Sequence, residues 1–224
     1  MDLGNTYLRL DQAWEMQELA DLARLYTQCY SLVYSLSGAR VDSEDEGVID
    51  WFHGVYAKYP WRGGYSALNF YHSLYAKIPY EQRPQIEEIQ YASPGHIKLK
   101  EAALVAALLA GIVTAVTTSF DQVHDSYNSI QKGMSERKLR KLEVDVAQLQ
   151  LDRERLKFIQ ESKQLLVDQM AIPEVMQEEL DRRSGGNELM QLKILMSFYR
   201  RVQPISELEL REMLKVEQQV AKSE

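Results

Sequence analysis

The sequence predicts a mainly α protein with a small β element (α+β), in which a helical bundle includes a long charged, partly coiled-coil-like helix. Apolar residues recur at helical spacing over most of the 224 residues. A stretch near the middle, residues 84–99, is instead partly β-branched and interrupted by prolines, as is typical of short strands and turns. Hydrophobic residues make up 45% and charged residues 26% of the chain. This composition is close to that of an average globular protein and predicts a buried core.

The first helix is expected over residues 14–36. Its apolar residues lie three or four positions apart, which predicts one buried and one solvated face. A short strand at residues 7–10 precedes it, and aromatic-rich helices are predicted at 48–59 and 65–77. The apolar positions of the first helix are Leu19, Leu22, Tyr26, Cys29, Tyr30 and Val33.

The clearest β signal is a strand at residues 86–91 followed by a second extended segment at 97–99. Between them, Ser93, Pro94 and Gly95 form a turn. Proline presets φ at the second position of a type II turn, and glycine accepts a positive φ at the third. We therefore predict a positive φ at Gly95.

Residues 102–120 form the most apolar stretch and contain no charged residue. Their number approaches the roughly 20 residues that cross a bilayer. Alanine and threonine dominate, however, and small residues spaced four apart form a ladder that lets another helix approach closely. We expect a helix buried in a core or an oligomer, with membrane insertion as the alternative. The expected contact residues are Ala106, Ala107 and Ala110.

A long charged helix is expected from about residue 121 to residue 170. An apolar heptad seam runs from Leu139 to Leu156 and is broken at Arg153. Two clean heptads are fewer than a coiled coil needs, so packing against the C-terminal helices and self-association both remain open. In either case we predict that the seam residues are buried in a contact: Leu142, Val146 and Leu149.

Basic residues gather beside this seam. One interpretation is a solvated helix face with ion pairs, such as Glu136 with Arg140 four positions later. The other is a patch that binds phosphate groups or lipid headgroups. The candidate anion-binding residues are Arg137, Lys138, Arg140 and Lys141.

Three further helices are expected towards the C-terminus. Pro173 suits a helix start, and Asn187 can cap an amphipathic helix that runs to about Val202. After Pro204, Ser206 and Glu209 have the spacing of a capping box for a final helix. The chain divides provisionally into an N-terminal helical and β module, residues 1–100, and a helical bundle, residues 101–224.

No catalytic, cofactor-binding or metal-binding residue is predicted. The four histidines lack metal-site spacing, and no phosphate-cradling glycine loop or nucleophile elbow is present. Glu87 and Glu88 are adjacent on a strand, so we expect them to face opposite sides and not to act as a pair. The single cysteine, Cys29, excludes an intramolecular disulfide and fits a reducing compartment.

Charge and the N-terminal segment bear on partners and location. The net charge is −7 and the pI is about 5.3, which argues against sequence-independent nucleic-acid binding. The first residues lack the basic and apolar regions of a secretory signal. We expect a cytoplasmic protein, with membrane association through residues 102–120 as the alternative.

The run Ile86-Glu-Glu-Ile-Gln-Tyr-Ala-Ser-Pro-Gly-His-Ile-Lys-Leu99, followed by an apolar small-residue helix, resembles a group of uncharacterised bacterial proteins. Those proteins have an isoleucine-rich strand, a tyrosine, a Ser-Pro-Gly turn, a second strand and a long helix. They are met in bacterial immune and conflict-type operons. The resemblance covers residues 1–135 and implies a coupling or effector-associated role, with no catalytic residues to transfer.

Together these features favour a non-catalytic bacterial interaction or assembly module that binds a protein partner or itself. The resemblance implies an accessory role in anti-phage defence. Two alternatives remain open from the residues alone. One is a membrane-acting effector that inserts residues 102–120, and the other is a small hydrolase or nucleotide-binding enzyme with an unrecognised site.

Overall fold

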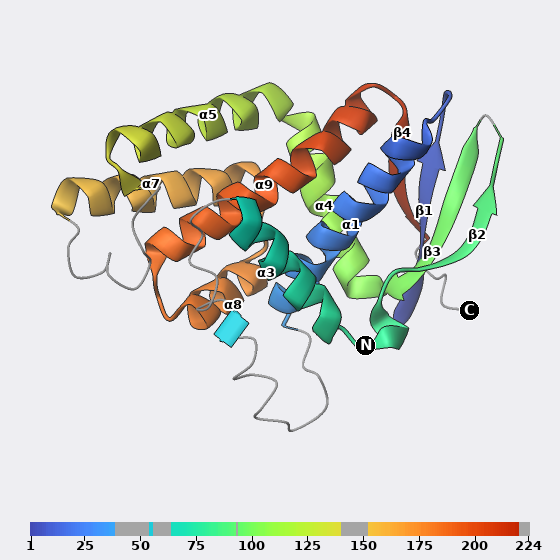
Figure 1. Ribbon diagram of the computed structural model, residues 1–224, viewed down its shortest axis with the longest axis horizontal. Coiled ribbons are helices and arrows are strands. Elements are labelled where there is room, and N and C mark those ends of the chain that lie inside the picture. The colour runs from blue at the N-terminus through green and yellow to red at the C-terminus, as the bar shows by residue number, and fades with distance from the viewer. Residues whose placement is uncertain (39–53, 56–63, 93, 140–151, 220–224) are drawn as a thin grey trace.

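The computed structural model describes residues 1–38, 54–55, 64–92, 94–139 and 152–219. The fold is α+β and mostly helical, with a helical body beside a four-stranded antiparallel sheet (Figure 1). Within the described ranges the helices are α1 (Met16–Leu36), α3 (Gly64–Lys77), α4 (Ala103–Thr118), α5 (Phe120–Glu136), α7 (Arg153–Gln169), α8 (Glu174–Ser184) and α9 (Glu188–Leu210), with a short 3-10 turn, η1 (Tyr80–Gln82). The strands are β1 (Leu3–Leu10), β2 (Gln85–Gln90), β3 (Gly95–Ala102) and β4 (Leu214–Gln219).

The sheet joins strands from distant parts of the chain in the order β2-β3-β1-β4. β1 pairs antiparallel with β3 on one side and with β4 on the other. The register puts Leu8, Leu99 and Leu214 on the face towards the helices, where each is at most 5% exposed. The provisional domain boundary between residues 100 and 101 falls inside β3. The last strand, β4, pairs with the first strand, β1.

The predictions for the N-terminal half are largely confirmed. The expected strand at 7–10 is longer, Leu3–Leu10, and the first helix is α1. The predicted helix at 65–77 is α3. The predicted helix at 48–59 lies largely outside the described residues. Only residues 54–55 of that range are described.

The helix α9 forms the centre of the helical body. It packs against α1, α4 and α7, and every residue from Leu189 to Tyr199 is buried. Asn187 caps it as predicted, because its side chain accepts a hydrogen bond from the backbone N–H of Met190 at 3.0 Å. A helix that is buried on all sides needs neighbours all round, and α1, α4 and α7 are among those neighbours.

The predicted break at Pro204 is wrong, and so is the capping box that was expected to follow it. α9 continues through Pro204 to Leu210. The Ser206 hydroxyl contacts the Val113 carbonyl at 3.4 Å, and Glu209 accepts hydrogen bonds from the Thr117 hydroxyl and from Val216 N–H. These side chains therefore tie α9 to α4 and β4 and do not start a helix.

The apolar and charged helices are not continuous. α4 ends at Thr118 and α5 begins at Phe120, with a 90° bend at Ser119 between them. The predicted helix through residue 170 is also wrong, because α5 ends at Glu136 and Asp152 caps a new helix, α7. Among the described residues no single helix is long and apolar enough to span a membrane, although α4 and α5 together pass that test as a bent pair.

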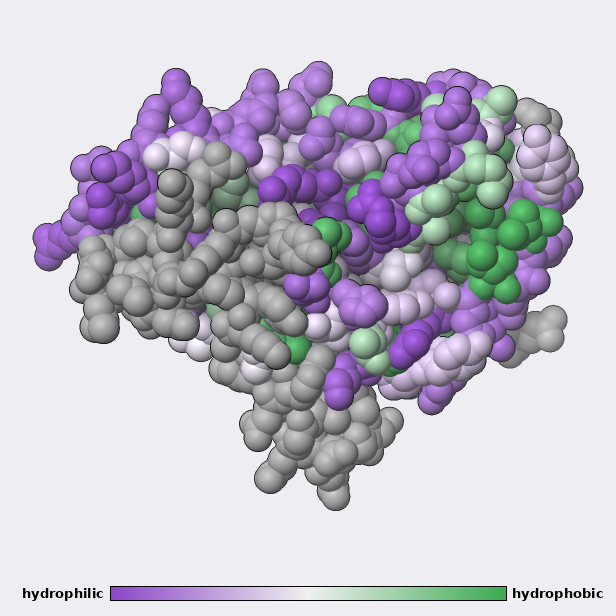
Figure 2. Space-filling model, viewed as in Figure 1, coloured by the Kyte–Doolittle hydropathy of each residue, from purple (hydrophilic) through white to green (hydrophobic). Residues whose placement is uncertain are grey.

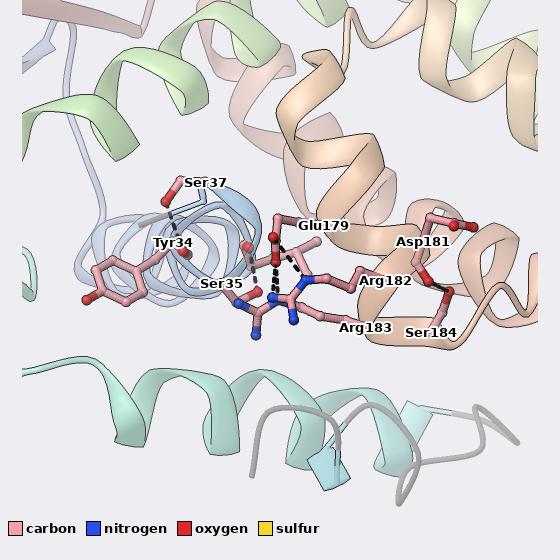
Figure 3. Close-up of polar contacts among 9 residues, drawn as sticks. Tyr34, Ser35, Ser37, Glu179, Asp181, Arg182, Arg183 and Ser184 are labelled. Atoms are coloured by element: carbon pink, nitrogen blue, oxygen red, sulfur yellow. Dashed lines mark hydrogen bonds and ion pairs between the residues drawn. The ribbon is translucent and has the colours of Figure 1, made fainter. Parts of the chain in front are cut away.

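Figure 3 shows how α8 meets the C-terminal turn of α1. Glu179 accepts hydrogen bonds from Arg182 at 2.7 Å and from Arg183 at 2.9 Å. The two arginine side chains extend from α8 towards Ser35 (Figure 3), and the last turn of α1 has no basic residue of its own. Positive charge near a helix C-terminus is favourable, so this cluster stabilises the packing of α8 on α1.

Candidate functional site

The strand β2 forms one edge of the sheet and exposes two large apolar side chains. It pairs with β3, and in the described part of the chain no strand pairs with its other edge. Ile86 and Ile89 lie opposite Leu99 and Ile97, so they share the apolar face of the sheet. Leu99 is 5% exposed, whereas Ile86 is 61% and Ile89 62% exposed. The apolar face thus continues beyond the part that the helices cover.

A β-bulge explains why two isoleucines three positions apart share one face. The pairing register shifts between Ile86 and Glu88, which leaves Glu87 as the extra residue. Glu87 forms ion pairs with Lys98 at 2.8 Å and Lys100 at 3.9 Å.

The bulge also overturns the expectation that the two glutamates face opposite sides. Glu88 lies 3.8 Å from His96, and Glu87 pairs with Lys98, which is on the same face of β3 as His96. The bond to Lys98 lowers the pKa of the Glu87 carboxyl from its ordinary value, with further help from Lys100. Both carboxylates are therefore balanced by cationic or titratable groups of β3.

The turn between β2 and β3 is where the sequence places it, but the predicted positive φ at Gly95 is wrong. Positive φ among the described glycines occurs at Gly38, Gly185 and Gly186. At Gly95 a Cβ atom would lie 2.6 Å from the Gln90 carbonyl oxygen and 2.8 Å from that of Ala92. Glycine is required because the hairpin backbone approaches too closely for any side chain.

The sequence of β2 is a palindrome: Gln85-Ile86-Glu87-Glu88-Ile89-Gln90. When a strand pairs antiparallel with a copy of itself about a twofold axis at the centre of the strand, each residue faces its mirror position in the other copy. A palindrome therefore brings glutamine opposite glutamine and isoleucine opposite isoleucine. This signal is visible in the sequence, but it becomes informative only once β2 is known to be an edge strand.

Exposed aromatic rings flank the strand. Tyr91 follows β2 and is 100% exposed, and Tyr80 in η1 is 72% exposed. Figure 2 shows hydrophobic surface gathered at the end of the molecule that carries the sheet. Exposed apolar groups that gather in this way are typical of interaction surfaces. We define the candidate assembly edge as Ile86, Ile89 and Tyr91 together with the open backbone of β2.

The three predicted contact residues of the apolar helix differ in how deeply they are buried. Ala106 is 2% exposed and packs in the core, as expected. Ala110 is half-buried and Ala107 is exposed, so Ala107 makes no buried helix contact within the described residues. The α4 residues that fill the core are larger: Val105, Leu109, Ile112, Val113 and Val116. The predicted seam residues Leu142, Val146 and Leu149 lie outside the described residues.

The predicted anion-binding cluster is only partly described. Arg137 is engaged at the end of α5, where it lies 4.2 Å above the Phe158 ring and 3.8 Å from Glu154. Lys138 is exposed and has a φ of 56°. The engagement of Arg137 favours a structural role for it. The other two residues, Arg140 and Lys141, lie outside the described residues.

A buried carboxylate was missed by the sequence reasoning. Glu101 on β3 is fully buried and points towards α1, where the Tyr26 hydroxyl donates a hydrogen bond to Oε1 at 2.6 Å. Its Oε2 atom and the buried Thr6 hydroxyl have no hydrogen-bond partner in the described part of the chain. Burial raises the pKa of Glu101 to about 7, although the hydrogen bond from the Tyr26 hydroxyl lowers it.

A metal site or a reactive histidine or cysteine finds no support in the described residues. No group of three or more histidine, cysteine, aspartate and glutamate side chains there could hold a metal ion. His124 is engaged, because its Nδ1 lies 3.3 Å from the Tyr199 hydroxyl and its ring stacks on Phe120. Cys29 is fully buried, and burial raises the pKa of its thiol to about 12.

Comparisons with known proteins add no assignment. No protein-family model, curated protein or solved structure matches the chain. The roles of the residues above therefore rest on geometry and chemistry.

Proposed function

We propose that this chain is an assembly module in which β2 pairs antiparallel with β2 of a second copy. The two four-stranded sheets then become one continuous sheet. The observation that carries the proposal is the palindromic edge strand with two exposed isoleucines. An extended strand added to an open sheet edge is a common mode of protein recognition.

Twofold symmetry accounts for the order of residues in β2. A symmetric dimer uses the same patch twice, so every contact occurs in duplicate. With the twofold axis between Glu87 and Glu88, Ile86 faces Ile89 of the second copy, and Ile89 faces Ile86 of the second copy. All four isoleucines then lie on one face of the joined sheet, because the bulge puts Ile86 and Ile89 on the same face within each copy.

The glutamates on the other face do not prevent this pairing. Like charges directly opposite one another in a sheet are unfavourable by some tenths of a kcal/mol up to about 1 kcal/mol. Here Glu87 is already paired with Lys98 and Lys100, and His96 lies beside Glu88. Two copies together bring four lysines to four glutamates, so the charges on this face are balanced.

The expected affinity is modest. Four isoleucines that are each about 60% exposed would contribute roughly 4–7 kcal/mol on complete burial. Hydrogen bonds between the two edges add about 0.5–1.5 kcal/mol each. Association costs about 4–15 kcal/mol in lost freedom of motion, so a dimer with a Kd in the micromolar range or weaker is expected.

The first prediction concerns the mass in solution. Light scattering between about 10 and 500 μM should show the wild type passing from monomer to dimer. The double variant Ile86→Lys, Ile89→Lys should stay monomeric and folded, because both side chains are exposed and fill no core. Leu165→Lys on α7 is the matched control, since Leu165 is 40% exposed and lies away from β2.

The proposal fails if the wild type is monomeric over this whole range. It also fails if the lysine variant dimerises as well as the wild type. Dimerisation that is lost equally in the Leu165→Lys control would place the contact elsewhere. The hydrophobic seam at Leu142, Val146 and Leu149 stays a prediction for a second contact in a partly coiled-coil-like helix.

An accessory role in anti-phage defence is proposed on the resemblance of residues 86–99 alone, with a cytoplasmic location. Membrane insertion is the weaker candidate on this fold. Val105, Leu109 and Ile112 are buried in the core, so α4 would have to leave the helical body in order to enter a bilayer.

A further inference from the structure

Two adjoining hollows lie among α1, α3 and α9, helices that pack together in the body of the molecule (Figure 1). The first, between α1 and α3, has a volume of about 550 Å³. The second, which α9 also lines, has a volume of about 480 Å³. Arg24 and Gln28 line both hollows, so we treat the two as one α1–α3–α9 groove. Its size is in the range of small-molecule sites.

Positive charge is concentrated in the second hollow. Arg24, Arg200 and Arg201 line it together with a single carboxylate, Asp21. Asp21 lies 2.9 Å from Arg24 and so balances one of the three guanidinium groups. Two positive charges remain on a chain whose net charge is −7, so the groove differs in sign from the molecule as a whole.

Arg201 is the most unusual of these residues, because it is only 9% exposed. Its Nε donates to Gln28 Oε1 at 2.7 Å, and its Nη1 donates to the Ser197 carbonyl at 2.8 Å and the Ser197 hydroxyl at 2.9 Å. The guanidinium also lies 3.9 Å over the Tyr71 ring. All of these partners are neutral, and no carboxylate in the described part of the chain pairs with Arg201. A buried charge without a countercharge is costly.

The remaining donors are preorganised for an anion. Nη2 of Arg201 donates no hydrogen bond within the described residues, and the contacts of Nε and Nη1 fix the plane of the guanidinium. Arg200 is exposed and has no hydrogen bond or ion pair in the same part of the chain. Planar guanidinium groups bind phosphate and carboxylate oxygens in a bidentate manner.

The first hollow provides a different environment. Tyr71, Tyr75 and His72 line it with Leu68, which is 47% exposed. The Tyr71 ring lies beneath Arg201, so it joins the aromatic hollow to the arginines. Aromatic and aliphatic side chains of this kind suit a flat ring in the ligand.

We propose that the α1–α3–α9 groove binds a phosphorylated small molecule with a planar ring, of the nucleotide class. Its phosphate lies against Arg24, Arg200 and Arg201, and its ring lies in the hollow lined by Tyr75, His72 and Leu68. The phosphate supplies the countercharge that Arg201 lacks. This site is separate from the candidate assembly edge and does not depend on it.

Calorimetric titration of the full chain with three probes tests the proposal: adenosine monophosphate, inorganic phosphate and adenosine. Adenosine monophosphate should bind at least about tenfold more tightly than either of its parts, because it occupies both hollows. The double variant Arg24→Gln, Arg200→Gln should weaken its binding at least about tenfold, since each charged hydrogen bond is strong. Arg153→Gln with Lys157→Gln on α7 is the matched control, which removes the same charge from exposed positions outside the groove and should change the affinity less than twofold.

The proposal is overturned if adenosine monophosphate does not bind at millimolar concentration. It is also overturned if the control variant weakens binding as much as the arginine variant, because the effect would then be one of net charge. Equal affinity for inorganic phosphate and adenosine monophosphate would also overturn it, because the ring would then make no contact in the first hollow. Arg201 is left unchanged in these variants, since its packing on Tyr71 and Ser197 also supports the fold.

Discussion

At the scale of single residues, the junction of the sheet with α1 depends on polar groups in the core. Tyr26, Tyr30 and Tyr34 lie four positions apart on α1, with ring centroids 6.5 and 6.3 Å apart. The Tyr30 hydroxyl accepts from Ala102 N–H and donates to the Gln82 carbonyl, and Tyr26 donates to Glu101. The sequence shows these tyrosines at helical spacing, but it cannot show that their hydroxyls reach β3 and η1.

Glu101 makes the stability of the fold depend on pH. Its pKa rises from the ordinary value of 4.5 to about 7 in the folded chain because burial disfavours the charged form. The folded state therefore binds the proton more tightly than the unfolded state. This contribution is fully present below about pH 4.5, is lost as pH rises to about 7, and amounts to roughly 3 kcal/mol.

The variant Glu101→Gln carries an amide that stays neutral at every pH. It should unfold like the wild type near pH 4.5 and be more stable by up to about 3 kcal/mol at pH 8. Urea denaturation of both proteins at several pH values measures the difference, in which the effects of all other carboxyl groups cancel. A difference that does not change between pH 4.5 and pH 8 would show that Glu101 is not a buried titrating group.

At the scale of elements, local sequence patterns correctly predicted several helices and one turn. Periodicity located α1 and α3, proline and glycine located the β2–β3 turn, and Asn187 marked the start of α9. The errors occur where tertiary contacts override a local signal. Pro204 normally ends a helix, yet α9 continues because Val202 and Ile205 on either side are fully buried. The bend at Ser119 and the end of α5 carry no such signal in the sequence.

The β2–β3 hairpin allows a direct test of this reasoning at Gly95. Gly95→Ala should lower the free energy of unfolding by more than about 1 kcal/mol, because its Cβ would lie 2.6 Å from a backbone oxygen that cannot move aside. Gly111→Ala on α4 is the control, since nothing lies within 4 Å of the added atom. In the middle of a helix that change should stabilise the protein by about 0.5–1 kcal/mol. Equal effects of the two substitutions on chemical denaturation would contradict this account of the turn.

At the scale of the whole molecule, the sheet could not have been foreseen from the sequence. β1 pairs with β4, which lies some 200 residues later, and β4 itself was predicted as part of a helical region. Because the strands come from both ends and the middle of the chain, the open edge at β2 appears only in the assembled fold. The candidate assembly edge was therefore hidden, although its palindrome is printed in the sequence. The α1–α3–α9 groove could not be predicted either, because its lining residues come from three separate helices that meet only in the folded chain.

The most direct test of assembly through β2 uses its register. The pairing proposed here brings Gln85 of one copy opposite Gln90 of the other, at a Cα separation of about 4.5–5.5 Å that suits a disulfide. Cys29 does not interfere, since it is fully buried and its thiol pKa is raised to about 12. The measurement is the yield of disulfide-linked dimer after mild oxidation of Gln85→Cys, of Gln90→Cys, and of an equal mixture of the two. The account predicts efficient linkage in the mixture and little in either variant alone, whereas equal linkage in all three samples, or none in the mixture, would contradict it.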